Sequence, residues 1–300
     1  MIVTRAFMDQ TWTDLNSPTK EELDSLILAQ NIDPIIAKDL STPTPKQYAK
    51  EFGKVIYAVI HIPFFKHSQM MNLEQEIDFI VSENGLVTTR YESIDALHHF
   101  AKRIEVNEIL NKSGHSHLFF GLMKEIYSFL FDEIEYLKDW IKNTEENIFK
   151  GREKEMVFRI SATGRNVLSF KRIVYPHKTV LESIELIAKN DFNGNFNKDV
   201  KLLLEEWQRL MLEIENISNM LDELRETNNS ILSAKQNDIM KQLTIIGSIL
   251  LPLTVIGQIF GLSVLSFPLK NHPFAFWIVL GIMAVVVLCS LAYVRFKKWT

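Results

Sequence analysis

The stretch "QLTIIGSILLPLTVIGQIFGLSVLSFPL", residues 242–269, contains no charged side chain. A second uncharged run follows at residues 273–294. A hydrocarbon layer of about 30 Å requires ~20 helical residues, so each run is long enough to cross a membrane once. The short connection between the two helices, residues 263–272, holds a single Lys, Lys270. The sequence therefore predicts a C-terminal membrane hairpin of two helices.

The chain ahead of this hairpin has a different composition. Charged residues are 23% of the 300 residues and are spread over residues 1–241, with a net charge of −4. After Lys241 the charged side chains are Lys270, Arg295, Lys297 and Lys298. A water-exposed body is thus followed by a membrane tail. The small net charge and the lack of a basic stripe with interleaved aromatic residues predict no nucleic-acid partner.

The basic C-terminus sets the expected orientation. Residues 295–299 read "RFKKW", and the positive-inside bias places such a flank in the cytoplasm. Two spans then return the N-terminal body to the same side, as in a multi-pass protein of the cell membrane. Arg5 and Asp9 interrupt the apolar core that an export signal would need, so no cleaved signal is expected. The single Cys289 allows no disulfide within the chain.

The first membrane run separates its polar and apolar side chains when it is placed on an α-helix. An α-helix turns by about 100° per residue. The side chains within about 40° of Thr244 are those of Asn237, Met240, Ser248, Leu251, Val255, Gln258 and Leu262. The opposite side carries Ile245, Ile246, Ile249, Leu250, Leu253, Ile256 and Phe260.

An amide such as Gln258 is costly in lipid, so this polar stripe must meet protein or water. Two interpretations fit: polar contacts that hold membrane helices together, or an axis shared by several copies. The stripe continues below the membrane to Asn237 and Met240, and this favours the shared axis.

A long helix leads into the first membrane span. Apolar residues recur at alternating spacings of four and three, and neither Pro nor Gly occurs between Lys198 and Ile246. The seam consists of Leu203, Trp207, Leu210, Ile214, Ile217, Leu221 and Leu224. A helix over residues 197–262 would measure roughly 100 Å, with Pro252 bending it inside the membrane. The seam indicates either a coiled coil or packing against the chain's own helices.

The N-terminal body mixes strands and helices. Thr19 and Glu22 have the spacing of a capping box, which predicts a helix start. Residues 54–62 and 76–91 are rich in β-branched residues, and Asn84-Gly85 breaks the second run as a hairpin turn. From about Ser93 the pattern is helical, with further helices on either side of Pro176 and Gly194.

The predicted fold class is therefore an α+β cytoplasmic domain, followed by a very long stalk helix and a two-helix membrane hairpin. The α/β part covers residues 1–112 and the helical part of the body covers 113–196. The stalk helix with the first span covers 197–262, the extracytoplasmic loop 263–272, the second span 273–294 and the basic end 295–300.

Motifs of enzyme chemistry are missing from the sequence. It has no phosphate-binding loop, no Gly-x-Ser-x-Gly and no metal-binding His pair at helical spacing, so no enzyme and no cofactor are predicted. The close histidine pairs His98-His99 and His115-Ser-His117 indicate ordinary structural histidines more than a metal site. The acidic residues Asp132, Glu133 and Glu135 are expected to form a solvated helix face.

This architecture resembles the CorA family of divalent-cation transporters over essentially the whole chain. The most specific part is "NDIMKQLTIIGSILLPLTVIGQIFGLS", residues 237–263, which resembles the family's first membrane helix. The segments "TWTDLNSPTKEEL" and "STPTPKQY" resemble its N-terminal domain. "KRIVYPHKTVL" resembles its Arg-Arg-x-x-x-Pro segment, and "RFKKW" its cytoplasmic end.

The resemblance implies a homopentamer in a lipid bilayer, with five first helices lining a pore for Mg²⁺. Zn²⁺, Co²⁺ and Ni²⁺ are other possible cargoes. The residues implied to face the axis are Asn237, Met240, Thr244, Gly247, Leu251, Thr254 and Gln258, and the helical stripe adds Ser248. Met240 and Leu251 would form hydrophobic rings of the kind that gate by dewetting.

The outer mouth departs from the family's Gly-Met-Asn hallmark. Gly261, Leu262 and Ser263 occupy these positions, and Lys270 follows in the loop. A Ser hydroxyl is a shorter acceptor than an Asn amide, and Lys270 would repel a cation. The sequence therefore leaves open a second function, a CorA-shaped sensor or scaffold that does not conduct. Candidates for a regulatory metal site, by their location near the stalk, are Asp199, Glu205 and Glu206, for which a solvated role is the alternative.

Overall fold

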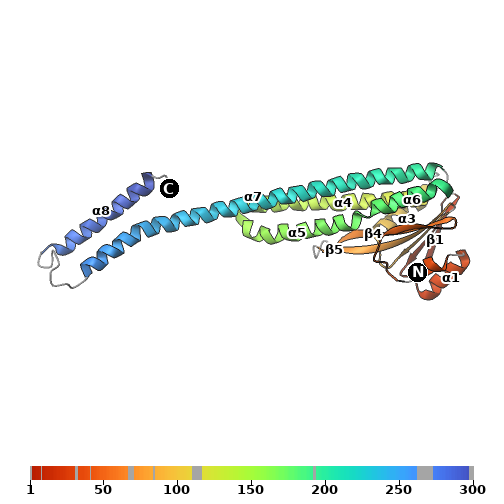
Figure 1. Cartoon of the computed structure of the whole chain (residues 1–300), viewed down its shortest axis with the longest axis horizontal. Helices are drawn as coiled ribbons and strands as arrows, with labels where there is room; N and C mark the ends of the chain where they lie inside the picture. Colours follow the sequence, from red (N-terminus) through yellow and green to blue (C-terminus); the bar gives the residue numbers. More distant parts are fainter. Residues whose placement is uncertain are drawn as a thin grey trace. The chain divides into compact units, whose positions relative to one another are not determined.

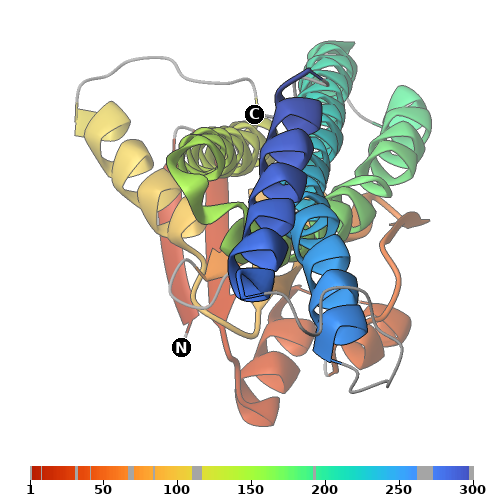
Figure 2. The ribbon, with the colours of Figure 1, turned by 90° about the vertical axis from the view of Figure 1, so that its left-hand side faces the viewer.

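The computed structural model describes residues 2–7, 9–30, 33–40, 42–66, 71–83, 85–109, 117–191, 194–261 and 273–296. The chain forms two compact units, Met1–Arg225 and Glu226–Thr300 (Figures 1 and 2). The first holds a sheet and several helices. The second holds the two apolar helices predicted from the sequence.

A six-stranded sheet organises the first unit, with the strand order β1-β2-β6-β5-β4-β3. The strands are β1 (Ile2–Phe7), β2 (Gln10–Asn16), β3 (Tyr48–Phe52), β4 (Val55–Lys66), β5 (Met71–Ser82) and β6 (Gly85–Arg90). The predicted hairpin is confirmed, because β5 and β6 pair antiparallel from Ser82 and Gly85 outward. Asn84 lies outside the described residues. The parallel pair β2–β6 was not anticipated from the sequence.

Two short helices, α1 (Lys20–Gln30) and α2 (Pro34–Asp39), cover one side of the sheet (Figure 1). The predicted capping box is present, since Thr19 N–H donates to Glu22 at 3.0 Å and Glu22 N–H donates to the Thr19 hydroxyl at 3.3 Å. Asp33 caps α2 through the Ile35 N–H at 2.8 Å. The buried core on this side contains Leu15, Leu23, Leu26, Ile36, Leu40, Tyr57, Val59, Ile80 and Val87.

Longer helices pack on the other side of the sheet. They are α3 (Asp95–Ile109), α4 (Leu118–Asn147), α5 (Glu153–Val174) and α6 (His177–Asp191). Edge-to-face aromatic pairs join α3 and α4 to the strands, with ring centroids 5.3 Å apart for Trp12 and Phe100 and 5.4 Å apart for Phe79 and Phe119. The chain reverses between α4 and α5 in η1 (Ile148–Arg152). There Gly151 adopts a φ of 89°, a left-handed conformation that favours glycine.

The long helix α7 (Gly194–Gly261) is continuous over 68 residues and contains Pro252. It begins three residues before the predicted start, a small difference for a helix end. The apolar seam is buried within a single chain at Leu203, Leu210, Ile214, Ile217, Leu221 and Leu224. The seam therefore packs against the protein's own helices, the second of the two alternatives. The second apolar helix, α8, spans Ala275–Phe296.

The prediction of a solvated acidic face on α4 was wrong for Glu133. Glu135 is exposed, but the side chain of Glu133 is buried, with the residue 7% exposed. Burial, helped by the charge of Asp132, raises the pKa of Glu133 to about 7. The helical spacing could have indicated this, because Glu133 lies three residues after Leu130 and four before Leu137, both buried on the inner face of α4.

Replacing Glu133 by Gln is expected to stabilise the protein at pH 8 by about 1–3 kcal/mol and to have little effect at pH 5. The native state binds the Glu133 proton more tightly than the unfolded state does. Its contribution to stability is therefore present below about pH 4.5 and lost as the pH rises through about 7. Thermal unfolding at the two pH values measures the difference. The exposed Glu135→Gln is the matched control, and an equal shift at both pH values would contradict the prediction.

Candidate functional site

The polar stripe of α7 is exposed in the single chain. Its exposed members are Asn237, Met240, Thr244, Ser248, Leu251, Thr254 and Gln258, while Gly247 is half-buried. On the opposite side of the same helix the half-buried residues are Ile245, Ile249, Leu253, Ile256 and Phe260. The chain thus covers part of the apolar side of its own first membrane helix, where Ile246 and Leu250 stay 53% exposed, and leaves the polar side open.

The second membrane helix, α8, contributes to this cover. Half-buried residues recur along α8 at helical spacing, at Ala275, Val279, Met283, Val286 and Ser290. A Cβ atom placed on Gly257 would lie 3.5 Å from the Met283 methyl carbon, so the two helices are neighbours at this depth. Gly257 lies about 140° from Thr244 around the helix. The partner helix therefore lies away from the stripe.

The hydroxyl groups of the stripe are oriented as acceptors. Thr244 donates to the Met240 carbonyl, and Ser248 to the Ile245 carbonyl, each at 2.8 Å. Thr254 donates to the Leu251 carbonyl at 2.8 Å. Each hydroxyl proton is used within the helix, so the oxygen lone pairs remain for another donor or a cation. The side-chain amide of Gln258 makes no hydrogen bond within the described part of the chain.

The predicted mouth is only partly described. Gly261 is the last residue of α7 and is exposed. Leu262, Ser263 and Lys270 lie outside the described residues, so their predicted roles stay predictions.

The acidic stalk residues do not form a metal site in the single chain. Asp199 is half-buried, and burial raises its pKa. Glu205 is exposed, and Glu206 pairs with Arg209 at 3.2 Å. Among the residues that the structure describes, no three His, Cys, Asp or Glu side chains are grouped to hold a metal ion.

The described histidines of the two close pairs named in the sequence analysis belong to different helices. His117 caps α4, where its Nδ1 accepts the Phe119 N–H at 3.1 Å and its Nε2 donates to the Ser82 carbonyl at 2.9 Å. Burial lowers the pKa of His117, which suits this neutral structural role. His98 and His99 lie on α3 with ring centroids 6.4 Å apart. His115 lies outside the described residues.

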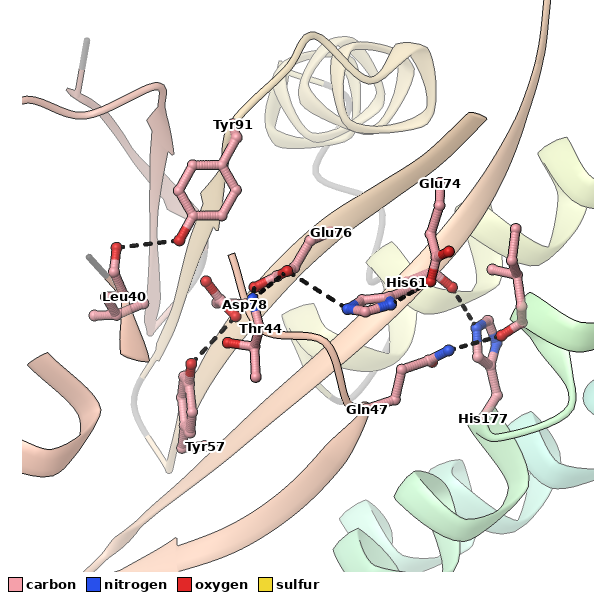
Figure 3. Close-up of polar contacts among 11 residues, drawn as sticks. Leu40, Thr44, Gln47, Tyr57, His61, Glu74, Glu76, Asp78, Tyr91 and His177 are labelled. Carbon is pink, nitrogen blue, oxygen red and sulfur yellow. Dashed lines mark hydrogen bonds and ion pairs between the residues drawn. The ribbon is translucent and has the colours of Figure 1, made fainter. Parts of the chain in front are cut away.

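A polar cluster in the first unit was missed by sequence reasoning (Figure 3). His61 of β4 lies between two carboxylates of β5, with Nδ1 2.6 Å from Glu74 and Nε2 3.5 Å from Glu76. Burial opposes protonation of His61, but the hydrogen bonds and charges of Glu76 and Glu74 outweigh it and raise the pKa. Both oxygens of Glu76 accept the Thr44 N–H, at 2.7 and 2.9 Å.

Deeper side chains complete this cluster. Tyr57 donates its hydroxyl to Asp78 at 3.2 Å, and burial together with the charge of Glu76 raises the pKa of Asp78. His177 of α6 donates its Nε2–H to the His61 carbonyl at 2.7 Å. Burial lowers the pKa of His177 to about 4, so this ring is neutral at physiological pH. The cluster thereby ties β4 to α6.

A cavity of about 530 Å³ opens beside these groups, lined by Thr44, His61, Glu74, Gln75, Glu76 and Glu92 among others. An adjoining cavity of about 460 Å³ shares His61 and Glu74 and adds Lys46 and Arg172. One sequence signal could have indicated the first cavity. Glu74, Glu76 and Asp78 alternate along β5, and alternate residues of a strand point to the same face.

Comparison with known proteins agrees with this architecture. Residues 9–298 match the family model described as CorA-like Mg²⁺ transporter protein. The chain is 25% identical over 275 residues to the cobalt/magnesium transport protein CorA of Thermotoga maritima, covering 89% of this chain and 77% of the relative. It is 20% identical over 291 residues to the metal ion transporter YfjQ of Bacillus subtilis, named there as putative, covering 96% and 89%.

The fold has a close counterpart among solved structures. The complete CorA magnesium transporter of Methanocaldococcus jannaschii superposes with a TM-score of 0.85 at 19% identity, covering 97% of this chain and 92% of the other. The α/β domain, the long helix and the C-terminal helix all take part in the match, which confirms the predicted fold class. CorA proteins are membrane transporters of divalent cations, not enzymes. A match over nearly the whole length places the present chain in the family of CorA-like Mg²⁺ transporter proteins.

Proposed function

We propose that this protein conducts divalent cations, Mg²⁺ first, across the cell membrane as a homopentamer whose five α7 helices surround a pore. The observation that carries the proposal is the polar stripe of α7 that α8 leaves uncovered. Exposed amides and hydroxyls are costly in hydrocarbon, so several copies must bring their stripes together around water. Both termini would lie in the cytoplasm.

The stripe would supply two kinds of surface to the pore. Acceptor oxygens suit a hydrated Mg²⁺ ion, which gives up its water reluctantly. The lining positions would be Asn237, Thr244, Gly247, Ser248, Thr254 and Gln258. Met240 and Leu251, both exposed in the single chain, would form hydrophobic rings that close the pore by excluding water. Gly261, Leu262 and Ser263 would form the mouth.

The cargo is inferred from relatives and from the chemistry of the stripe. The Thermotoga maritima relative is named as a cobalt/magnesium transport protein, which supports Mg²⁺ and Co²⁺. Oxygen acceptors without thiolate or imidazole groups favour Mg²⁺, a hard ion, over Zn²⁺ or Ni²⁺.

The mouth favours one alternative function. Ser263 stands where the family has Asn, and Lys270 adds a positive charge in the following loop. A ring of five lysines would repel cations. The alternative is a CorA-shaped sensor or scaffold subunit that assembles without conducting.

Uptake of Mg²⁺, Co²⁺, Zn²⁺ and Ni²⁺ by vesicles that contain the purified pentamer separates these functions. Saturable Mg²⁺ uptake is expected from the native protein. Ser263→Asn is expected to increase it several-fold, because the amide offers a longer acceptor to the hydrated ion, whereas the loop control Ser266→Asn should leave it unchanged. Assembled pentamers that carry none of the four ions would favour the alternative.

A further inference from the structure

We propose that His61, Glu74 and Glu76 form a pH-sensitive joint, which holds the α5–α6 turn on the sheet while the His61 ring is charged and loosens it when the ring loses its proton. This turn lies between the end of α5 at Val174 and the start of α6 at His177. The joint lies within the first unit and does not depend on whether the protein conducts ions.

The position of the His61 ring suits an imidazolium. His61 is 6% exposed, and each ring nitrogen faces a carboxylate, Nδ1 at 2.6 Å from Glu74 and Nε2 at 3.5 Å from Glu76 (Figure 3). A neutral imidazole carries one N–H and can serve only one of these carboxylates, whereas an imidazolium presents an N–H to both. The strand register sets this arrangement, because His61 lies directly opposite Glu76 and Glu74 lies opposite Pro63. The charged ring therefore holds two acidic side chains together.

The groups around His61 are mostly acidic. Those that line the adjoining cavities or act on its charge are Glu74, Glu76 and Asp78 of β5, Tyr91 and Glu92 after β6, Lys46 before β3, Arg172 of α5 and His177 of α6. Burial lowers the pKa of His61, but the hydrogen bonds and charges of Glu76 and Glu74 outweigh burial and raise it. Burial lowers the pKa of His177 to about 4, so that ring stays neutral while His61 titrates.

The two carboxylates connect the His61 ring to the end of α5. The Thr44 N–H donates to both oxygens of Glu76, at 2.7 and 2.9 Å, which fixes the segment of residues 42–47. Gln47 of this segment donates its Nε2–H to the Ile173 carbonyl at 2.8 Å. On the other side of the ring, Glu74 lies 3.8 Å from the Arg172 guanidinium. Both carboxylates that hold the imidazolium thus lead to the last turn of α5.

Backbone contacts extend the connection to α6 and α7. The His61 carbonyl accepts the Nε2–H of His177 at 2.7 Å (Figure 3). The Val174 carbonyl accepts the Nε1–H of Trp207 at 3.0 Å, and Trp207 belongs to the long helix α7. The α5–α6 turn therefore lies between the sheet and α7, and a change of charge at His61 acts on the element that joins them.

The direction of the switch follows from the raised pKa of His61. The charged ring contributes its full stabilisation below about pH 6.5, the ordinary pKa of histidine, and this stabilisation is lost as the pH rises through the raised pKa of the folded state. Above that pKa the ring keeps one N–H, and Glu74 and Glu76 repel each other without a cation between them. The segment 42–47 and the α5–α6 turn then lose their fixed partners on the sheet.

Hydrogen exchange of the full chain in lipid nanodiscs, at about pH 6 and about pH 9 and corrected for the intrinsic rate at each pH, tests the joint. In peptides that cover residues 42–47 and 171–177, protection is expected to fall about tenfold at the higher pH. His61→Gln should show the low protection at both pH values. The exposed His99→Gln on α3 is the control and should keep the native response. Burial raises the pKa of Glu133 to about 7, so peptides of α4 are left out of the comparison.

Two further variants separate a charge switch from simple packing. NMR of the chain labelled with ¹³C at histidine Cε1 follows the titration of His61. Glu74→Gln, at a position whose side chain is 43% exposed, should move the midpoint to lower pH, because it removes a carboxylate that holds the proton. Arg172→Gln should move the midpoint to higher pH, because Glu74 then acts on His61 without a competing cation.

Three results would overturn the proposal. One is a native His61 that titrates at or below about pH 6.5. Another is protection of the two segments that does not change with pH, and the third is a folded His61→Gln that keeps the native response. If His61→Gln does not fold, the midpoints of the native chain, Glu74→Gln and Arg172→Gln decide, and equal midpoints in all three would refute the joint.

Discussion

Replacing Gln258 by Ala is expected to lower divalent-cation uptake at least tenfold. Gln258 is exposed on the stripe, and its amide makes no hydrogen bond within the described part of the chain. In the proposed pentamer, five such amides would accept hydrogen bonds from the hydrated ion. A hydrogen bond to a charged group contributes roughly 1.5–3 kcal/mol, and about 1.4 kcal/mol corresponds to a factor of ten. Initial uptake rates in vesicles give the comparison.

Leu250→Ala is the matched control for this prediction. Leu250 lies on the same membrane segment, is 53% exposed, and points about 120° away from Thr244. It is expected to face lipid, so its truncation should leave uptake close to native. If Leu250→Ala abolishes uptake while Gln258→Ala leaves it unchanged, the stripe does not face a pore. Assembly of both variants is checked by their elution as pentamers.

Replacing Arg90 by Ala is expected to destabilise the sheet by about 3–5 kcal/mol, because it leaves a buried charge without its partner. Arg90 Nη2 lies 2.9 Å from the Asp14 carboxylate, and the two side chains are 10% and 9% exposed. Thr88 also donates to Asp14 at 2.8 Å, so the carboxylate is held in place between β2 and β6. Hydrogen exchange of the amides in these two strands measures the loss.

Lys150→Ala provides the comparison with a solvated ion pair. Lys150 lies 3.3 Å from Glu146, and the two side chains are 67% and 53% exposed. Such pairs contribute about 0–1 kcal/mol, so little change is expected. The double variant Asp14→Asn with Arg90→Met should recover much of the stability, because no buried charge then remains unpaired. Equal effects of Arg90→Ala and Lys150→Ala would contradict the assigned role.

Several elements could be predicted because their causes are local in the chain. The two spans follow from uninterrupted apolar length, and the start of α1 follows from Thr19 and Glu22, three residues apart. The β5–β6 hairpin follows from its turn residues. The polar stripe of α7 follows from helical periodicity alone, since one helix determines which of its own side chains share a face.

The cavity beside β5 could not be predicted in the same way. Its groups come from β4, β5 and the segments at Thr44 and Glu92, which only the folded sheet brings together. Alternation along β5 shows that Glu74 and Glu76 share a face, but it does not show that His61 lies opposite them. The register of β4 against β5 decides that, and a shift by one residue would turn His61 to the other face.

The sequence by itself determined the membrane hairpin, the long helix and the side of that helix on which polar groups gather, because each depends on residues within a few turns of one another. Only the tertiary structure decided which side α8 covers, which strands pair in parallel, and which carboxyl groups become buried. Those outcomes depend on contacts between residues that are far apart in the chain, where burial of apolar side chains competes with pairing of polar ones. A local sequence pattern does not determine which of these contacts forms.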